Sequence, residues 1–233
     1  MKGALPFDSA HYARRPEGLV VTWQGDRSAP RHDLGSYFAS CACLEAASVV
    51  AFTHLVADLK SRRAPPALVD MAERAQEDGM LHAERTMRLA RQFAKPPTSF
   101  AVKKRRVRTR VEIARDNAAE GCVREAFGAA VGLWQAKHAK GKDVREAFAL
   151  MGTNKLRHVE LAWTAAEWLD RSLDARERAS VETARTTALT ALQNEIALPL
   201  APVLVDVAGV PPMQTALSLF DAIKKQIDAR CAA

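Results

Sequence analysis

Apolar positions along the chain follow a helical repeat in nearly every segment after residue 32. Between Asp33 and Lys60 they surround the helix almost without a break, which is typical of a helix buried on most sides. Asp33 itself is a suitable N-cap. No segment shows a convincing strand alternation, so the pattern predicts an all-α protein. Further helices are expected at about 67–94, 109–140, 143–171, 174–195 and 213–230.

The same pattern divides the chain into three parts. Residues 1–32 lack periodicity and contain three prolines, which indicates an irregular N-terminal arm laid over the domain or a partly disordered lead. Residues 33–171 hold four long helices, as a four-helix bundle requires. Residues 172–233 are expected to form a C-terminal helical extension packed on the bundle. Within it, the Pro-interrupted apolar segment 197–212 is expected to cover a bundle face, with a homodimer contact as the alternative.

Composition bears on compartment and partners. The N-terminus lacks the apolar run of a signal peptide, and no stretch approaches the roughly 20 apolar residues of a membrane span, so a cytoplasmic protein without membrane contact is expected. The net charge of +7 raises the hypothesis of a nucleic-acid or acidic partner at Lys103, Lys104, Arg105 and Arg106. No aromatic residues are interleaved there for base stacking, which favours a solvated loop.

An internal repeat relates the first two of the four helices to the last two. Glu45 and Glu120 each lie inside an apolar helix, 75 positions apart, and His82 and His158 lie in the partner helices, 76 positions apart. A Glu buried in an apolar face is costly unless it is paired, protonated or bound to metal. A single helical His is usually a hydrogen-bonded core residue, but four such residues in register are expected to converge in the interior.

These residues carry a resemblance to a known family. The chain resembles the ferritin-like di-iron carboxylate superfamily over roughly residues 34–170, about 60% of its length. In such bundles one Glu comes from each of two helices and a Glu-x-x-His motif from each of the other two. The resemblance implies Glu45 and Glu120 as the single ligands, and His82 and His158 as the motif histidines. It rests on the segments LEAASVVAFTHL, APPALVDMAERAQEDGMLHAERTMRLARQF, DNAAEGCVREAFGAAV and RHVELAWTAAEWL.

The chain departs from the family pattern at both motif glutamates. Gly79 stands three residues before His82, and Lys155 stands three residues before His158. Two carboxylates and one ammonium give a charge of −1, whereas the intact motif would supply four carboxylates to offset two metal ions. The inherited two-metal site is therefore expected to be damaged.

The substitutions suggest what replaces the metals. Lys155 is predicted to hydrogen-bond Glu45, Glu120 or both, and Gly79 to leave room for the lysine stem or for water. The leading hypothesis is a metal-free, non-catalytic protein that acts as a binding or structural module. The alternative is an oxidoreductase with a mononuclear or asymmetric iron or manganese site, to which Asp78 supplies a substitute ligand. In that alternative Lys155 has a lowered pKa and acts as a base or nucleophile.

Overall fold

The computed structural model is predominantly helical, which confirms the predicted all-α class. It describes residues 10–22, 29–93, 99–104 and 106–232. Parts of the expected N-terminal arm, residues 1–9 and 23–28, lie outside the described residues, as does Arg105 of the basic stretch.

The helices begin and end within a few residues of the predicted positions. The short helix α7, inside the Pro-interrupted connector, was not predicted. The helical elements are α1 (Leu34–Ser61), α2 (Pro66–Gln92), α3 (Arg110–Asp116), the π-helical η2 (Asn117–Glu125), α4 (Ala126–His138), α5 (Lys142–Asp170), α6 (Ala175–Ile196), α7 (Pro202–Asp206) and α8 (Met213–Ala232).

Side-chain caps explain where three of these helices begin. The carboxylate of Asp33 accepts hydrogen bonds from the first backbone N–H groups of α1, which confirms its expected N-cap role. Thr109 and Glu112 form a capping box at α3, and Asp174 and Glu177 form another at α6. Because each cap satisfies backbone donors that the helix itself cannot, the starts are fixed by local sequence.

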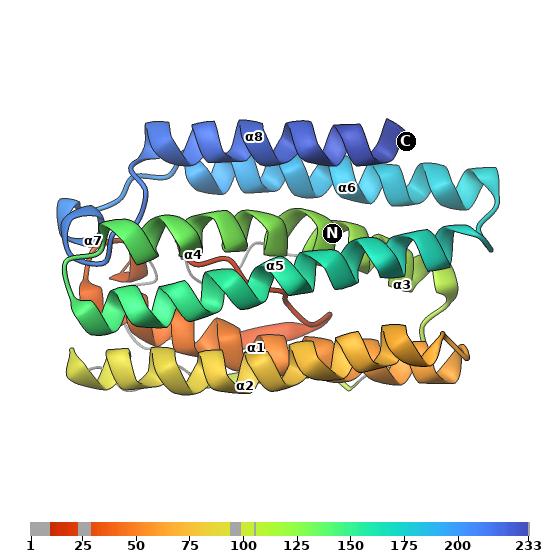
Figure 1. Ribbon diagram of the computed structural model, residues 1–233, viewed down its shortest axis with the longest axis horizontal. Coiled ribbons are helices and arrows are strands. Elements are labelled where there is room, and N and C mark those ends of the chain that lie inside the picture. Colours follow the sequence, from red (N-terminus) through yellow and green to blue (C-terminus); the bar gives the residue numbers. More distant parts are fainter. Residues whose placement is uncertain (1–9, 23–28, 94–98, 105, 233) are drawn as a thin grey trace.

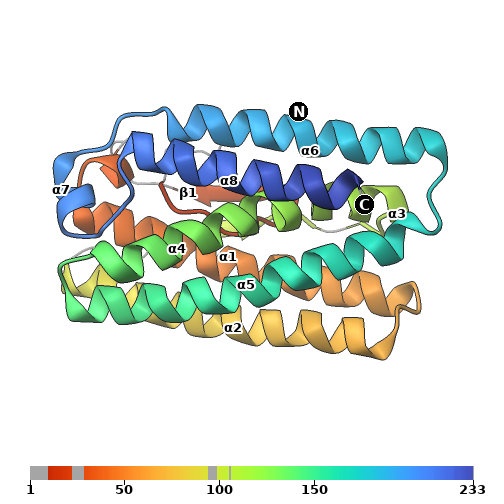
Figure 2. The same cartoon turned by 45° about the horizontal axis from the view of Figure 1, so that its top comes forward.

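Four helical segments form the centre of the molecule, here called the helical core: α1, α2, α3–η2–α4 and α5. In it α1 packs along α2, α2 along α5, and α5 along η2 and α4. The helices α6 and α8 form an outer layer against η2 and α4, on the side away from α1 and α2 (Figures 1 and 2).

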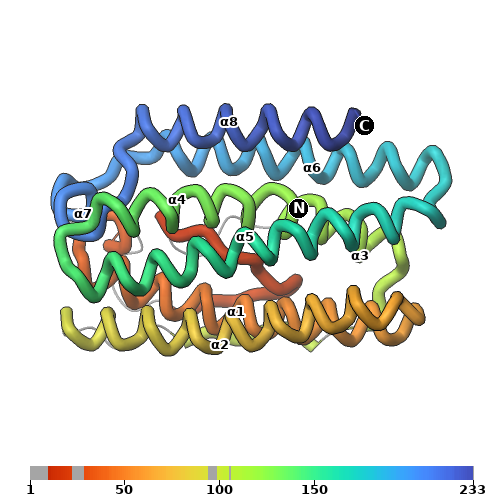
Figure 3. Tube along the Cα trace, in the orientation of Figure 1, coloured from red at the N-terminus to blue at the C-terminus, as the bar shows by residue number. Residues whose placement is uncertain are grey.

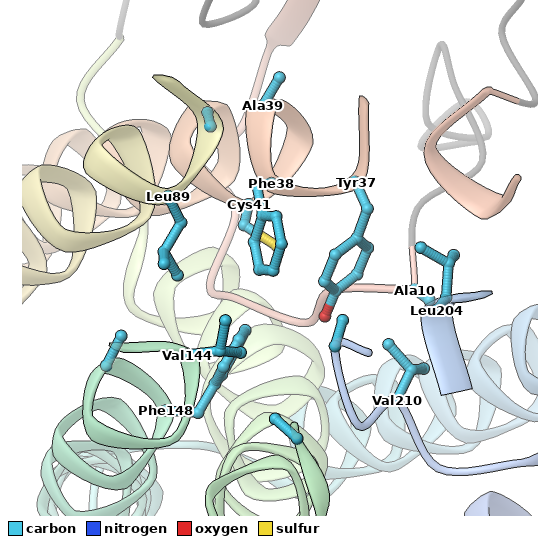
Figure 4. Close-up of a cluster of buried hydrophobic side chains, with 14 of the residues drawn as sticks. Ala10, Tyr37, Phe38, Ala39, Cys41, Leu89, Val144, Phe148, Leu204 and Val210 are labelled. Carbon is cyan, nitrogen blue, oxygen red and sulfur yellow. The ribbon is translucent and has the colours of Figure 1, made fainter. Parts of the chain in front are cut away.

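Apolar clusters fill both ends of the helical core. At one end Tyr37 and Phe38 of α1 lie over Phe148 of α5, and Leu204 of α7 closes the edge (Figure 4). At the other end Phe52 and its neighbours pack among α1, α2, α3 and α5. The charged residues of the candidate site therefore lie between two apolar regions, which keep water away from them.

A two-stranded antiparallel sheet lies beside α1. Strand β1 (Leu19–Thr22) pairs with β2 (Ser99–Val102), with Leu19 opposite Val102 and Thr22 opposite Ser99. The expectation of no strand is therefore wrong. Segments of four residues are too short for alternation to be recognised, and the pairing depends on partners about 80 residues apart.

Residues 10–16, here called the inner arm, run through the interior rather than over the surface. The inner arm crosses between α1 and α4, and the tube in Figure 3 shows it in red. Across the described residues, α1 makes at most marginal contact with η2 and α4. Six residues of the inner arm are buried: Ala10, His11, Tyr12, Ala13, Arg14 and Pro16. The inner arm thus fills the side of the helical core where α1 does not pack closely along η2 and α4.

Helix α1 is long and apolar enough to cross a membrane by length and composition alone. The expectation that no stretch approaches a membrane span is therefore wrong when length and apolar composition alone are considered. However, 72% of its most apolar window is buried inside the protein, and a buried core helix passes the same test.

Candidate functional site

A lysine ammonium lies at the centre of the helical core, between two carboxylates. Lys155 of α5 is 1% exposed. Its Nζ lies 3.2 Å from Oε1 of Glu45 on α1 and 3.0 Å from Oε1 of Glu125 on η2. The predicted contact between Lys155 and Glu45 is therefore present.

Each of these carboxylates also binds a histidine through its other oxygen. His82 Nδ1 lies 3.2 Å from Oε2 of Glu45, and His158 Nδ1 lies 3.0 Å from Oε2 of Glu125. Ionised carboxylates only accept hydrogen bonds, so each Nδ1 donates. The two Glu–His pairs and the shared lysine give the two halves of the helical core the same arrangement.

The carboxylate that the third helical segment places at Lys155 is Glu125, five residues after the predicted Glu120. Glu120 is buried but lies further along the inner arm, where Oε2 accepts from Arg15 Nε at 3.1 Å and lies 3.8 Å from Arg124 Nε. The prediction that Lys155 hydrogen-bonds Glu120 therefore named the wrong carboxylate. Glu125 follows Glu120 by about one π-helical turn of η2, so both carboxylates are buried on the same face, and Glu125 lies at the level of Lys155.

The inner arm contributes a histidine that the sequence patterns did not reveal. His11 Nε2 donates to Oε1 of Glu45 at 2.6 Å, and its ring is 5% exposed. Three residues later, the backbone N–H of Arg14 donates to Oε1 of Glu125, also at 2.6 Å. The carboxylates of Glu45 and Glu125 thus each bind a histidine, the shared lysine and one group of the inner arm. A possible signal was the pair Gly121 and Gly128, because small residues in a helix indicate close approach of another segment.

Asp78, the predicted substitute ligand, lies at the solvent-facing edge of the site. Its Oδ2 lies 3.2 Å from His158 Nε2, and Asn154 and Arg157 donate to the same carboxylate. Both ring nitrogens of His158 therefore face carboxylates, Glu125 on one side and Asp78 on the other. An imidazole between two acceptors must carry two N–H groups, so His158 is held as a cation.

Shifted pKa values follow from these contacts. Burial raises the pKa of Glu125, but Lys155 and His158 outweigh it and lower the pKa to about 2. Burial likewise raises the pKa of Glu45, and Lys155, His11 and His82 bring it well below the ordinary value. Both carboxylates are therefore ionised at neutral pH.

The pKa values of His11, His158 and Lys155 are raised instead. Burial lowers the pKa of His11, but Cys41 and Glu45 beside its ring raise it by more, to about 9. The pKa of His158 is lowered by burial and raised above its ordinary value by Asp78 and Glu125. The pKa of His11 therefore lies above neutral pH, and the two carboxylates beside His158 favour its charged form.

Lys155 is held as an ammonium. Burial lowers its pKa, and Glu125 and Glu45 raise it above the ordinary value. A catalytic base requires the opposite shift. The space that adjoins its side chain, lined by His11, Tyr12, Gly128 and others, has no room for a water molecule. The predicted role of Lys155 as base or nucleophile therefore lacks both a lowered pKa and a place for substrate.

The room for the lysine stem comes from a different glycine than expected. A side-chain Cβ at Gly79 would meet a methyl group of Val49 at 3.2 Å, so Gly79 allows α2 to approach α1. A Cβ at Gly128 would lie 3.5 Å from Cδ of Lys155 and 2.3 Å from the carbonyl oxygen of Tyr12. Gly128 therefore accommodates both the lysine and the inner arm.

The described residues do not fit the two-metal centre that the family resemblance implies. An ammonium stands within 3.2 Å of both central carboxylates. Within the described ranges, no three His, Cys, Asp or Glu side chains are grouped so that they could hold a metal ion. Three carboxylates (Glu45, Asp78, Glu125) face His11, Lys155 and His158, and Arg157 also pairs with Asp78, so no negative charge of the site is left without a cationic partner. A divalent ion would add two positive charges to a dry, balanced cluster.

The basic stretch is partly occupied by contacts within the protein. Arg108 is buried and donates to the carboxylate of Asp58, and Arg106 forms an ion pair with Glu112. Lys103 and Lys104 are exposed. The described residues of the predicted stretch, Lys103, Lys104 and Arg106, are thus all exposed, although Arg106 also pairs with Glu112.

Comparisons with known proteins add no name to this geometry. No family model, no curated protein and no solved structure matches the chain.

Proposed function

We propose that the protein is a ferritin-like four-helix bundle in which side-chain cations have replaced the metals, and that it acts as a non-catalytic binding or structural module in the cytoplasm. The observation that carries this proposal is the ammonium of Lys155 between Glu45 and Glu125. An ion pair buried in this way adds little net stability, but it keeps two inward carboxylates ionised and fixed in position.

Charge balance supports the same proposal. In a two-metal centre of this superfamily the carboxylates offset the metal ions. Here His11, Lys155 and His158 offset the carboxylates instead. An oxidoreductase with one iron or manganese would require Lys155 to leave Glu45 and Glu125, and no contact of the described residues favours such a movement.

Metal analysis tests the proposal. Protein purified without chelator, then titrated with ferrous iron, should contain no stoichiometric metal and show no saturable binding. The variant Lys155→Glu restores one motif carboxylate and changes the charge of the site by two units. It should therefore bind Mn²⁺ more tightly than the wild type. Tight stoichiometric iron in the wild type would refute the proposal.

A further inference from the structure

The inner arm lies between helices from distant parts of the chain, and the space that it fills between them is here called the groove. One wall is α1, and the other is formed by η2 and α4, which α1 does not closely approach. Two glycines in the second wall lack side chains, so the inner arm can approach the helix backbone closely there. A Cβ at Gly128 would be 2.3 Å from the carbonyl oxygen of Tyr12, and a Cβ at Gly121 would be 2.9 Å from the guanidinium of Arg14. The groove is therefore shaped for an extended backbone.

Carboxylates along the groove hold the inner arm in register. Glu125 accepts from the backbone N–H of Arg14 at 2.6 Å. Glu120 accepts from the backbone N–H of Arg15 at 3.1 Å and also from its guanidinium, through Nε at 3.1 Å and Nη2 at 3.0 Å. The backbone N–H groups of two successive residues thus donate to two glutamates that lie about one π-helical turn apart.

Side chains of the inner arm also contact residues of the groove. His11 donates to Glu45 at 2.6 Å, and the guanidinium of Arg14 lies 3.4 Å from the carboxylate of Asp116. The ring of Tyr12 packs edge-on against Phe127, with ring centroids 4.7 Å apart. The groove therefore selects a basic segment with an aromatic residue between the histidine and the paired arginines.

We propose that this groove is a peptide-binding site for an extended basic segment, and that the inner arm occupies it as an internal ligand. The external partner is a protein segment of the same chemistry: a histidine, an aromatic residue and paired arginines in extended conformation. The inference rests on the proposed function, because Glu45 can bind a histidine of a peptide only while Lys155, and not metal, occupies the centre. It adds to that function the class of partner and the means of its regulation.

Tethering makes the inner arm a strong competitor. A ligand joined to its site by a short stretch of chain acts at an effective concentration in the millimolar range. A free peptide therefore meets an occupied groove in the wild type. Weakening the internal ligand opens the groove without altering its walls.

The test uses a fluorescent peptide with the sequence of residues 10–16 and the full chain. The variant His11→Ala/Arg14→Ala/Arg15→Ala loses the side-chain contacts of the internal ligand. It should bind the peptide at least about tenfold more tightly than the wild type does, as measured by fluorescence anisotropy. A peptide in which glutamates replace both arginines is the control and should not bind either protein.

A fourth substitution shows where the peptide binds. Adding Gly128→Ala to the triple variant places a methyl group on the path of the peptide backbone, so binding should be lost. Equal binding with and without Gly128→Ala would overturn the proposal. So would the absence of peptide binding to a triple variant that keeps the helical circular dichroism of the wild type.

If the variants do not fold, hydrogen exchange of the wild-type protein still tests the proposal. The backbone amides of Arg14 and Arg15 are held by glutamates and should exchange slowly. Millimolar free peptide should displace the inner arm and speed their exchange, while the glutamate-containing control should not. Unchanged exchange would contradict the proposal. The metal content of the protein is independent of either result, so failure here is distinguishable from failure of the proposed function.

Discussion

The α1–α2 half of the helical core and the α3–α5 half hold a glutamate and a histidine in the same way, but they obtain their cations differently. In the second half Lys155 comes from the helix that also carries His158. In the first half the equivalent position is Gly79, and the additional cation is His11 of the inner arm. One half thus carries its cation on its own helix, whereas the other relies on a segment outside the repeat. This difference explains why the inner arm is buried.

The strongest way to break the comparison is to remove the shared cation. Lys155→Met keeps the length of the stem but leaves Glu45 and Glu125 facing each other without the ammonium. We expect a loss of about 3–5 kcal/mol in the free energy of unfolding, measured by urea denaturation. The control Lys142→Met removes an exposed lysine and should change stability by less than about 0.5 kcal/mol. Equal effects of the two substitutions would contradict the account.

The second test uses the pH dependence of stability, which in the α1–α2 half depends on His11. The pKa of His11 is about 9, above its ordinary value, so its contribution to stability is complete below pH 6.5 and is lost as the pH rises through 9. We expect a loss on the order of 2–3 kcal/mol over this range. His11→Gln should remove this dependence, whereas His138→Gln, at an exposed position, should keep it. A wild type whose stability is flat from pH 6.5 to 9 would refute the role of His11.

Acid tests the other half. The pKa of Glu125 is about 2, below its ordinary value, so its contribution is present above pH 4.5 and is lost as the pH falls through 2. Replacing it with glutamine should flatten the acid limb of the stability profile. If the acid limb is identical in Glu125→Gln and the wild type, the ion pairs of Glu125 with Lys155 and His158 are contradicted.

Two glycine substitutions sharpen the comparison further. Gly128→Ala would place a methyl group 2.3 Å from the backbone oxygen of Tyr12, and we expect a loss of about 1–3 kcal/mol. Gly79→Ala meets only a methyl group of Val49 at 3.2 Å, and its better helix propensity offsets up to about 1 kcal/mol. Thermal unfolding of both variants should therefore rank Gly128→Ala as the more damaging. The reverse ranking would count against the packing of the inner arm.

The smallest effect is expected at the edge of the site. Arg157 pairs with Asp78, but its side chain is 58% exposed. Arg157→Ala should therefore lower stability by less than about 1 kcal/mol, because solvent screens the pair. A loss above about 2 kcal/mol in urea denaturation would show that this edge is part of the buried charge cluster.

Local signals in the sequence predicted the helices and part of the site. The cap at Asp33 was predicted, and the capping boxes at Thr109 and Asp174, which the structure adds, also depend only on neighbouring residues. The contact between Lys155 and Glu45 followed from counting positions in a helix repeat. Such counting works where the helix is regular.

The remainder depends on features that counting does not reveal. The π-helical η2 places both Glu120 and Glu125 on its buried face, and no residue type alone shows that Glu125 is the one at Lys155. His11 enters the site through tertiary contacts of a segment without periodicity. The pairing of β1 with β2 also joins segments far apart in the chain.

The most direct test of the central claim is a crystal structure with anomalous diffraction measured at the iron and zinc edges, from protein purified without chelator. The account predicts no anomalous peak among the four central helices and the Nζ of Lys155 between Glu45 and Glu125. Two anomalous peaks at that position, with the lysine turned away, would contradict it.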